Sequence, residues 1–253
     1  RGTGTMTPET YYYGQGKVFL GRRNAQGQAV SLRWIGDVGE LQIALTTDSF
    51  THKESYTGQR APVRRISTGK DGTVTATWYE HSPDNLAILL YGEKVAVPAG
   101  TITGEALPAG IQAGERVTLN HQNVSAVTIA DLVEGTDYKL DAKFGALEFL
   151  TTPATQPLSV NYTHASSVNT SVFTQTPDEL FLRYEGINLA ENGAAVVVEL
   201  YRVQYDPASA LSLINTDTSL PGLETTATVL LDTERPDDAQ FGRYGRVIHV
   251  GSV

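Results

Sequence analysis

The chain has 253 residues, with 19 Lys and Arg against 28 Asp and Glu, so its net charge is −9. It contains no cysteine, which excludes disulfides, thiolate metal sites and a cysteine nucleophile. No apolar run approaches the roughly 20 residues that a membrane-spanning helix needs, and the first residues show no signal peptide, so no membrane partner is expected. An acidic surface repels phosphate, which argues against specific nucleic-acid binding.

Charge is distributed unevenly along the sequence. Residues 1–92 contain 10 Lys and Arg against 8 Asp and Glu, whereas residues 93–253 contain 9 against 20. Such asymmetry lets one part of a subunit attract a different part of its neighbour. The length fits one large all-β domain or two small ones. Because no internal repeat or low-complexity segment interrupts it, we expect a single domain over residues 1–253.

The first residues alternate between strand patterns and stretches without a period. Residues 1–16 lack a period and are interpreted as an N-terminal arm. Leu41, Ile43 and Leu45 then fall on every second position, which is typical of a strand with one buried face. Residues 46–66 are polar and basic and again lack a period, so they predict a long loop.

A tight turn and a second strand are predicted next. Asp71 and Gly72 belong to residue types that readily adopt positive φ, so the chain is expected to turn at Lys70–Gly72. Val74, Ala76 and Trp78 follow on alternate positions, with threonines between them. This pattern predicts a strand that buries its apolar side chains.

One helix is predicted over residues 83–91. Ser82 is a good N-cap residue, and Pro83 suits the first helical position because its missing N–H costs nothing there. Gly92 is expected to be the C′ residue that ends the helix. The helix is too short to be stable alone and should cover one sheet. Its packing face is expected to consist of Leu86, Leu89 and Leu90.

The second half continues as short strands. Residues 93–157 are interpreted as an elaboration of the single domain, with Asp141–Gly145 linking two short strands inside it. Leu158–Thr163 alternates like a half-buried strand. Glu191–Gly193 predicts a turn. Val196–Val203 is apolar on both faces apart from Glu199 and Arg202, which predicts a central or interface-buried strand.

The sequence carries no motif of a catalytic or cofactor site. It has no G-x-S-x-G element, phosphate-binding loop or dinucleotide fingerprint. A pair of carboxylates arranged for glycoside hydrolysis is the enzymatic alternative, but the many acids of a β-rich chain are better explained as solvated surface. We therefore expect no enzyme, no cofactor and no metal site. The histidines lack metal-pair spacing, and they are His52, His81, His121, His164 and His249.

The order of several segments resembles the major tail tube proteins of long, non-contractile-tailed bacteriophages, the siphophages. That family has a strand, a long loop, a hairpin and a helix in this order, followed by two further hairpin patterns. The segments that carry the resemblance here are Gly36–Leu45, Lys53–Gly58, Thr73–Tyr79, Ser82–Gly92, Val133–Asp141, Phe144–Leu147 and Phe181–Leu213.

The resemblance implies a mainly β fold, an antiparallel β-sandwich or small barrel with one flanking α-helix, similar to the tubes of contractile tails and type VI secretion. It implies hexameric rings that stack into a hollow tube, located in the virion tail and assembled in the host cytoplasm. Implied partners are further copies of the chain, the tape measure protein and the tail terminator and tip proteins, while genomic DNA passes through the lumen without specific binding. The competing interpretation is an extracellular β-sandwich adhesin or carbohydrate-binding module.

Two sets of charged residues gain a role if the chain forms a tube. The long loop 46–66 is expected to bridge adjacent rings, because its cations can seek a neighbour's carboxylates in an otherwise acidic protein; these cations are Lys53, Arg60, Arg64 and Arg65. An acidic lumen would let DNA slide without forming ion pairs. The candidate lumen-facing residues are Glu40, Glu185 and Glu199, for which solvent exposure outside the tube or pairing with Arg183 and Arg202 is the alternative.

Overall fold

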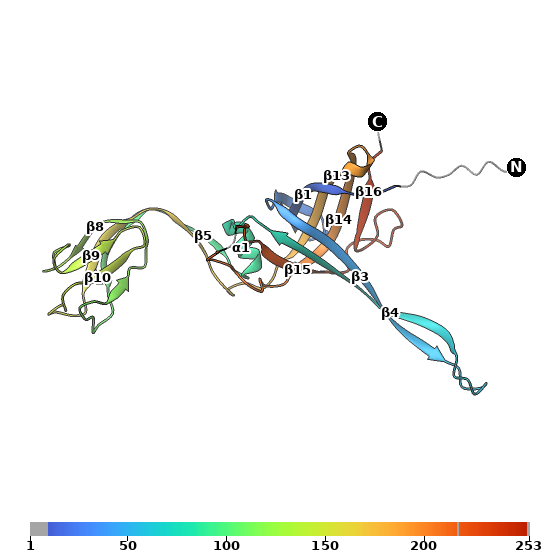
Figure 1. Cartoon of the computed structure of the whole chain (residues 1–253), viewed down its shortest axis with the longest axis horizontal. Helices are drawn as coiled ribbons and strands as arrows, with labels where there is room; N and C mark the ends of the chain where they lie inside the picture. Colours follow the sequence, from blue (N-terminus) through green and yellow to red (C-terminus); the bar gives the residue numbers. More distant parts are fainter. Residues whose placement is uncertain (1–9, 217, 252–253) are drawn as a thin grey trace. The chain divides into compact units, whose positions relative to one another are not determined.

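The computed structural model describes residues 10–216 and 218–251. The fold is mainly β, with antiparallel sheets and one α-helix in the described part, as expected from the sequence (Figure 1). The structure differs from the single-domain expectation, because its contacts divide the chain into two compact units. The interrupted unit comprises Arg1–Glu93 and Ser171–Val253, and the inserted unit comprises Lys94–Thr170.

The interrupted unit is built on one antiparallel sheet. Its strands follow the order β2-β1-β13-β14-β15-β4-β3, and β16 also pairs with β14. Within the described residues β2, β3 and β16 each pair on one side only. The strands are β1 (Gly14–Arg23), β2 (Ala29–Trp34), β3 (Val38–Lys53), β4 (Pro62–Trp78), β13 (Glu179–Asn188), β14 (Ala194–Tyr205), β15 (Leu223–Val229) and β16 (Gly245–His249).

One hydrophobic core holds this sheet together. It contains side chains from β1 and β4, which are four places apart in the sheet order, so the sheet must curve around the core. The predicted alternation in β4 is confirmed, since Val74, Ala76 and Trp78 are all buried. Trp78 also contacts Tyr205 edge to face, with ring centroids 5.0 Å apart.

Strand β14 is the central strand of the sheet, as the doubly apolar run Val196–Val203 predicts. One edge of β14 pairs with β13 along nearly its whole length. Its other edge is shared, because residues 196–200 pair with β16 and residues 203–205 pair with β15. The sheet therefore forks beside β14. The turn predicted before this strand is confirmed by a 3-10 helix, η1 (Leu189–Glu191), followed by two residues with positive φ.

The helix α1 (Pro83–Leu89) packs on the core of the interrupted unit. The Ser82 side chain accepts a hydrogen bond from the Asn85 N–H, which confirms the predicted N-cap. Leu89 is buried, and Leu86 packs beside it, but Ile88 rather than Leu90 completes the packing face. Leu90 is the C-cap residue, where the chain already leaves the helical path.

The end of α1 differs by one residue from the prediction. Tyr91, with φ of 50°, takes the left-handed C′ position that we expected for Gly92. The N–H of Gly92 donates to the Ala87 carbonyl at 2.9 Å and closes the last turn. A Cβ on Gly92 would lie 1.7 Å from the Ser171 carbonyl oxygen. Close backbone approach, and not a left-handed φ, is therefore the reason for glycine here.

The inserted unit has its own core between two small sheets. One sheet has the order β6-β11-β8 and the other β7-β10-β9, while β5 and β12 form a separate two-stranded pair. The buried alternation Leu158, Val160 and Tyr162 around β11 confirms the predicted strand. The strands are β5 (Lys94–Val97), β6 (Gly100–Ala106), β7 (Arg116–Thr118), β8 (Val124–Ile129), β9 (Tyr138–Asp141), β10 (Ala146–Phe149), β11 (Ser159–His164) and β12 (Ser167–Thr170).

Two local predictions about β3 and β4 are wrong. No turn occurs at Lys70–Gly72, because this segment runs straight through β4, where Gly72 pairs with Leu45 of β3. The expected inward face of β3 is also interrupted. A bulge lies between Gly39 and Gln42, and Glu40 adopts a φ of 53° within it. Beyond this bulge Leu45 is 77% exposed.

The predicted N-terminal arm over residues 1–16 falls mostly outside the described residues. Within them, residues 14–16 already belong to β1. Residues 11–13 are held against the turn after β13, since the Asn188 side chain donates to the Tyr11 carbonyl and accepts from the Tyr13 N–H. No helix in the described ranges is both long and apolar enough to cross a membrane.

Candidate assembly surface

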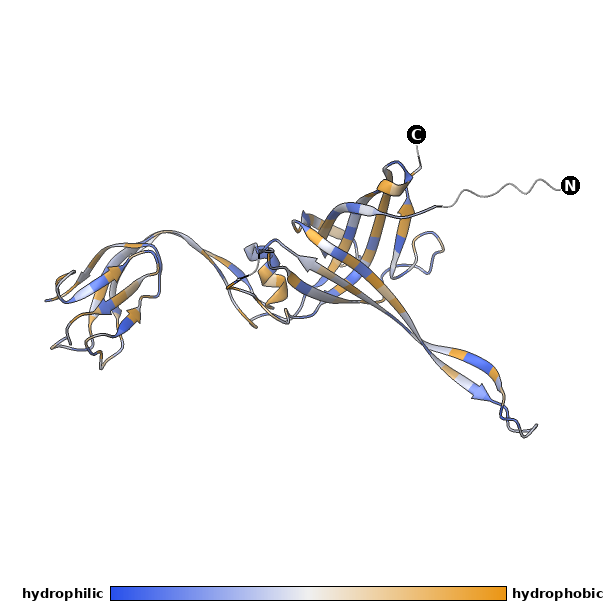
Figure 2. Cartoon of the chain, in the orientation of Figure 1, coloured by the Kyte–Doolittle hydropathy of each residue, from blue (hydrophilic) through white to orange (hydrophobic). Residues whose placement is uncertain are grey.

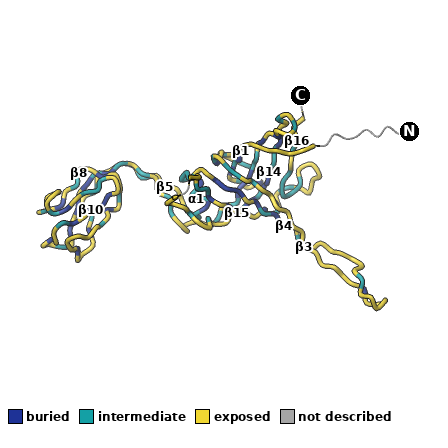
Figure 3. The backbone as a smooth tube through the Cα atoms, viewed as in Figure 1, coloured by how far each residue is buried: buried dark blue, intermediate teal, exposed yellow. Residues whose placement is uncertain are grey.

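The segment 46–66, which we name the hairpin arm, is a two-stranded extension of β3 and β4. It was expected to be a loop, but residues 46–53 and 62–66 are paired strands and only residues 54–61 form the connecting tip. Every residue of the arm is exposed except Glu54 and the half-buried Ala61 (Figure 3). The arm therefore has strand structure without a core of its own.

The arm presents both cations and apolar side chains to solvent. Lys53 and Arg60 lie at the tip and are exposed. Arg64 and Arg65 are consecutive in β4, so they point to opposite faces of the hairpin. Arg65 donates through Nε to the Ser49 hydroxyl at 2.8 Å. Hydrophobic and hydrophilic positions both occur along the arm (Figure 2). The exposed apolar side chains are Phe50, Tyr56, Val63 and Ile66.

Glu54 organises the tip of the arm. Its carboxylate accepts from the N–H groups of Tyr56 and Thr57, both at 2.8 Å, from the Ala61 N–H at 3.3 Å and from the Thr57 hydroxyl. These hydrogen bonds, that of the Thr57 hydroxyl above all, lower the pKa of Glu54 to about 2. The side chain thus closes residues 54–61 into a defined loop around one carboxylate.

Two of the three lumen candidates belong to an ion-pair network on the sheet. Glu199 is only 7% exposed, and it accepts from Arg183 and, at 2.7 Å, from Arg246. Arg183 also donates to Glu185 at 2.6 Å. Pairing with Arg183, the alternative that we gave for these acids, is present. Arg202 is not part of this network, since it pairs with Glu179.

The burial of Glu199 does not fit a residue that faces a water-filled lumen. A buried carboxylate between two guanidinium groups is neutralised locally and contributes little field outside. Glu185 is exposed on the same strand that carries Arg183, and Glu40 is exposed on the bulge of β3. Glu40 and Glu185 are therefore the exposed acids of the original set.

A second group of buried charges, which the sequence did not reveal, holds the segment after β15. Asp232 is fully buried and accepts from Arg23 at 2.6 Å and from Arg235 at 3.2 Å. The guanidinium of Arg235 also lies over the Tyr201 ring, 3.7 Å from its centroid. Further along the segment, Asp238 accepts from the N–H groups of Gln240 and Phe241. These ion pairs and hydrogen bonds stabilise the fold of this segment.

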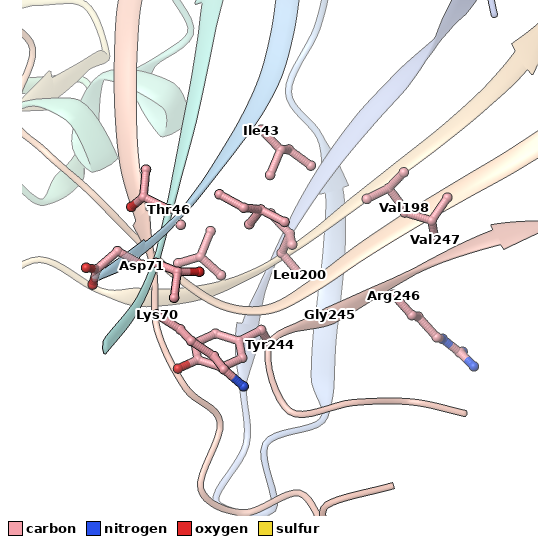
Figure 4. Close-up of a pocket in the computed structure, with 14 residues that line it drawn as sticks. Ile43, Thr46, Lys70, Asp71, Val198, Leu200, Tyr244, Gly245, Arg246 and Val247 are labelled. Atoms are coloured by element: carbon pink, nitrogen blue, oxygen red, sulfur yellow. The ribbon is translucent and has the colours of Figure 1, made fainter. Parts of the chain in front are cut away.

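The fork of the sheet encloses an apolar cavity of about 420 Å³, the fork cavity. It lies where β16 separates from β15, β4 and β3 (Figure 4). Lys70 and Asp71 contribute polar groups to its lining, whereas the guanidinium of Arg246 is paired with Glu199. Two of the residues that line it, Val247 and Leu45, are largely exposed to solvent. The apolar lining includes Ile43, Leu45, Val198, Leu200, Val229 and Val247.

The inserted unit brings together two histidines that are distant in sequence. The rings of His121 and His164 stack with centroids 3.8 Å apart. Tyr162 lies beside them, with 3.0 Å between its hydroxyl and His121 Nδ1, and it donates to Glu105. Burial and the Glu105 carboxylate raise the pKa of Tyr162. Only the pairing of β11 with its neighbours creates this cluster, so the spacing of histidines along the chain gave no sign of it.

The sequence was compared with protein families and with curated proteins. No curated protein gives a significant match to the sequence. A family model described as "Protein of unknown function UCP028589" matches residues 11–248. This range contains the hairpin arm, the fork cavity and the whole inserted unit. The chain therefore belongs to the family of unknown function UCP028589.

Proposed function

We propose that the chain is a self-assembling structural subunit of a phage tail tube. The observation that carries the proposal is the hairpin arm, a long pair of strands with almost no buried side chain. An isolated two-stranded hairpin is marginally stable in water. Burial of the arm against other copies would supply the contacts that its own subunit does not.

The edges of the sheet support assembly as well. Strand β2 ends the sheet on one side and exposes the apolar side chains of Val30, Leu32 and Trp34. Strands β3 and β16 have a second edge that no described strand covers. Unpaired edges of this kind are a liability for a lone β protein, and a closed ring removes them. A ring of six copies is the arrangement implied by the resemblance to tail tube proteins.

The arm is the element that we assign to contacts between stacked rings. It carries exposed cations at its tip and on both faces, whereas the chain as a whole is acidic. In this proposal the lumen conducts DNA past exposed acids, of which Glu40 and Glu185 are the candidates. The ends of the tube would bind the tape measure, terminator and tip proteins, in the virion tail.

Reversal of two arm charges tests this function. The double variant Arg64→Glu with Arg65→Glu should fold normally, since both side chains are exposed, but should form few or no tubes in negative-stain electron micrographs. Lys139→Glu with Lys143→Glu makes the same charge change on exposed residues of the inserted unit and serves as the matched control. Tubes of normal length in the arm variant would refute the role of the arm.

The wild-type chain tests the proposal more broadly. Purified protein should form rings or hollow tubes at high concentration, measured by light scattering and electron microscopy. A strict monomer, even with tail-tip and tape measure partners present, would contradict the tube. Glycan or protein recognition by such a monomer would instead favour the adhesin or carbohydrate-binding interpretation.

A further inference from the structure

A loop on the interrupted unit exposes apolar side chains without cover from its own chain. Residues 207–222, which we name the apolar loop, connect β14 to β15. Leu213, Ile214 and Leu220 are 79%, 90% and 80% exposed. The start of the loop is nevertheless fixed, because the Ala208 N–H donates to the Leu89 carbonyl at 2.8 Å and Leu211 packs against the core. A loop that is anchored at its start and exposes aliphatic side chains to water indicates a binding surface.

The same unit contains an open apolar site that this loop does not fill. The apolar loop leads into β15 at Leu223, whereas Val229, at the other end of β15, lines the fork cavity. Six residue steps along a strand span about 20 Å. The loop is held near Leu89 and the Thr77 side chain, at the end of the strands remote from the cavity. The exposed side chains and the cavity thus occupy opposite ends of the strands.

We propose that the apolar loop of one copy inserts Leu213 and Ile214 into the fork cavity of the next copy. This inference rests on the proposed tube function and names the surfaces that meet. A patch that complements a pocket elsewhere on the same molecule makes a heterologous contact, which repeats from copy to copy. The polar lining at Lys70 and Asp71 offers a donor and an acceptor for the backbone of the incoming loop.

The position of the hairpin arm agrees with this direction of contact. The arm continues β3 and β4 from the cavity end, since Leu45 and Gly72 line the cavity and the arm begins at Thr46. The arm therefore extends toward the copy that donates the loop. Burial of the cavity and of the arm then occurs in the same contact between successive copies.

Cysteine cross-linking tests the contact directly, because the natural chain has no cysteine. Ile214→Cys protein is mixed with Val247→Cys protein under assembly conditions and oxidised, and products are separated on a non-reducing gel. A heterodimer should form in the mixture, and the double variant should give a ladder of multimers. Ile214→Cys mixed with Lys139→Cys, whose cysteine lies on an exposed strand of the inserted unit, is the control and should not give a heterodimer.

Electron microscopy of the same samples separates this inference from the tube function. Tubes without the heterodimer would overturn the loop–cavity contact and leave the tube proposal standing. The heterodimer without tubes would support the contact and contradict the tube. Absence of both would overturn both.

Two substitutions in the apolar loop provide a second measurement. Ile214→Asp should raise the concentration needed for assembly about tenfold or more, because a charge would have to enter an apolar site. Asn215→Asp adds the same charge to the neighbouring exposed position and should change that concentration much less. Equal effects of the two variants would show that charge, and not insertion of Ile214, is responsible.

Discussion

Glu54 shows how one side chain can order a segment that lacks a core. Its carboxylate receives several hydrogen bonds from the tip of the arm, and together they keep its pKa at about 2, below the ordinary value of 4.5. A group whose pKa is lowered in the folded state stabilises that state above its ordinary pKa and loses this effect as the pH falls toward the lowered value. The tip is therefore stabilised at neutral pH and opens in strong acid.

This dependence can be measured on the tip itself. The amides of Tyr56 and Thr57 should stay protected from hydrogen exchange at pH 4 and lose protection as the pH approaches 2. Glu54→Gln should weaken protection across this range and remove its dependence on pH, because the amide cannot ionise. A wild-type tip that opens with a midpoint near pH 4.5 would contradict the proposed role of the carboxylate.

The sequence predicts several buried apolar residues correctly, but it does not predict the partners of several buried charged residues. Val74, Ala76 and Trp78 were predicted correctly because one face of their strand is buried and the other is not. Pairing of Glu199 with Arg183 was given as an alternative, but its contact with Arg246 and the burial of Asp232 were not predicted. Their arginine partners come from other strands or from segments beyond tight turns, and side-chain type alone does not specify such pairings.

At the scale of elements, the helix α1 depends on the core beneath it. Leu89 is fully buried, so Leu89→Ala should lower the free energy of unfolding by about 2–5 kcal/mol. Leu90→Ala, one residue further and outside the core contacts, should cost less than about 1 kcal/mol. Urea unfolding followed by the fluorescence of Trp78, which lies in the same core, compares the two. Equal losses would show that the helix packs differently.

The hairpin arm shows why some strands escape prediction. Sequence patterns reveal a strand through the alternation of buried and exposed side chains. Neither face of the arm is buried within the subunit, so Phe50 and Ile66 have no inward neighbours to set a period. The turn predicted at Asp71–Gly72 was wrong for a related reason. A residue pair that favours tight turns is tolerated inside a strand when the partner strand, here β3, continues beside it.

At the scale of the whole molecule, the inserted unit leaves and rejoins the interrupted unit at one point. Glu93 and Ser171 are linked there, with the Ser171 N–H donating to the Glu93 carbonyl at 3.1 Å and the Glu93 N–H to the Ser171 hydroxyl at 2.9 Å. Glu93 and Ser171, between which the inserted unit begins and ends, are thus close enough for a tight turn to connect them.

Removal of the inserted unit should therefore leave a folded protein. We expect a chain in which Asn-Gly replaces residues 94–170 to keep its β circular dichroism and its buried Trp78 fluorescence. It should also keep the tube assembly of the complete chain, since the arm, the apolar loop and the fork cavity all lie outside the deletion. An aggregated or unfolded product would show that the interrupted unit needs the insertion.

The interruption also determines when each part can fold during synthesis. Strand β1 pairs with β13, so the pair Gly14–Asn188 can form only after residue 188 has been synthesised. The central strand β14 and its partner β16 are synthesised later still. The inserted unit contains all of its own pairings and is complete as soon as Thr170 has emerged. During synthesis the inserted unit can therefore fold first, while β1 and β4 still lack their partners β13 and β15. Long-range pairing of this kind is slow and leaves strand edges open to wrong partners. For this chain, the last residues of β16 mark the point at which the nascent strands become protected.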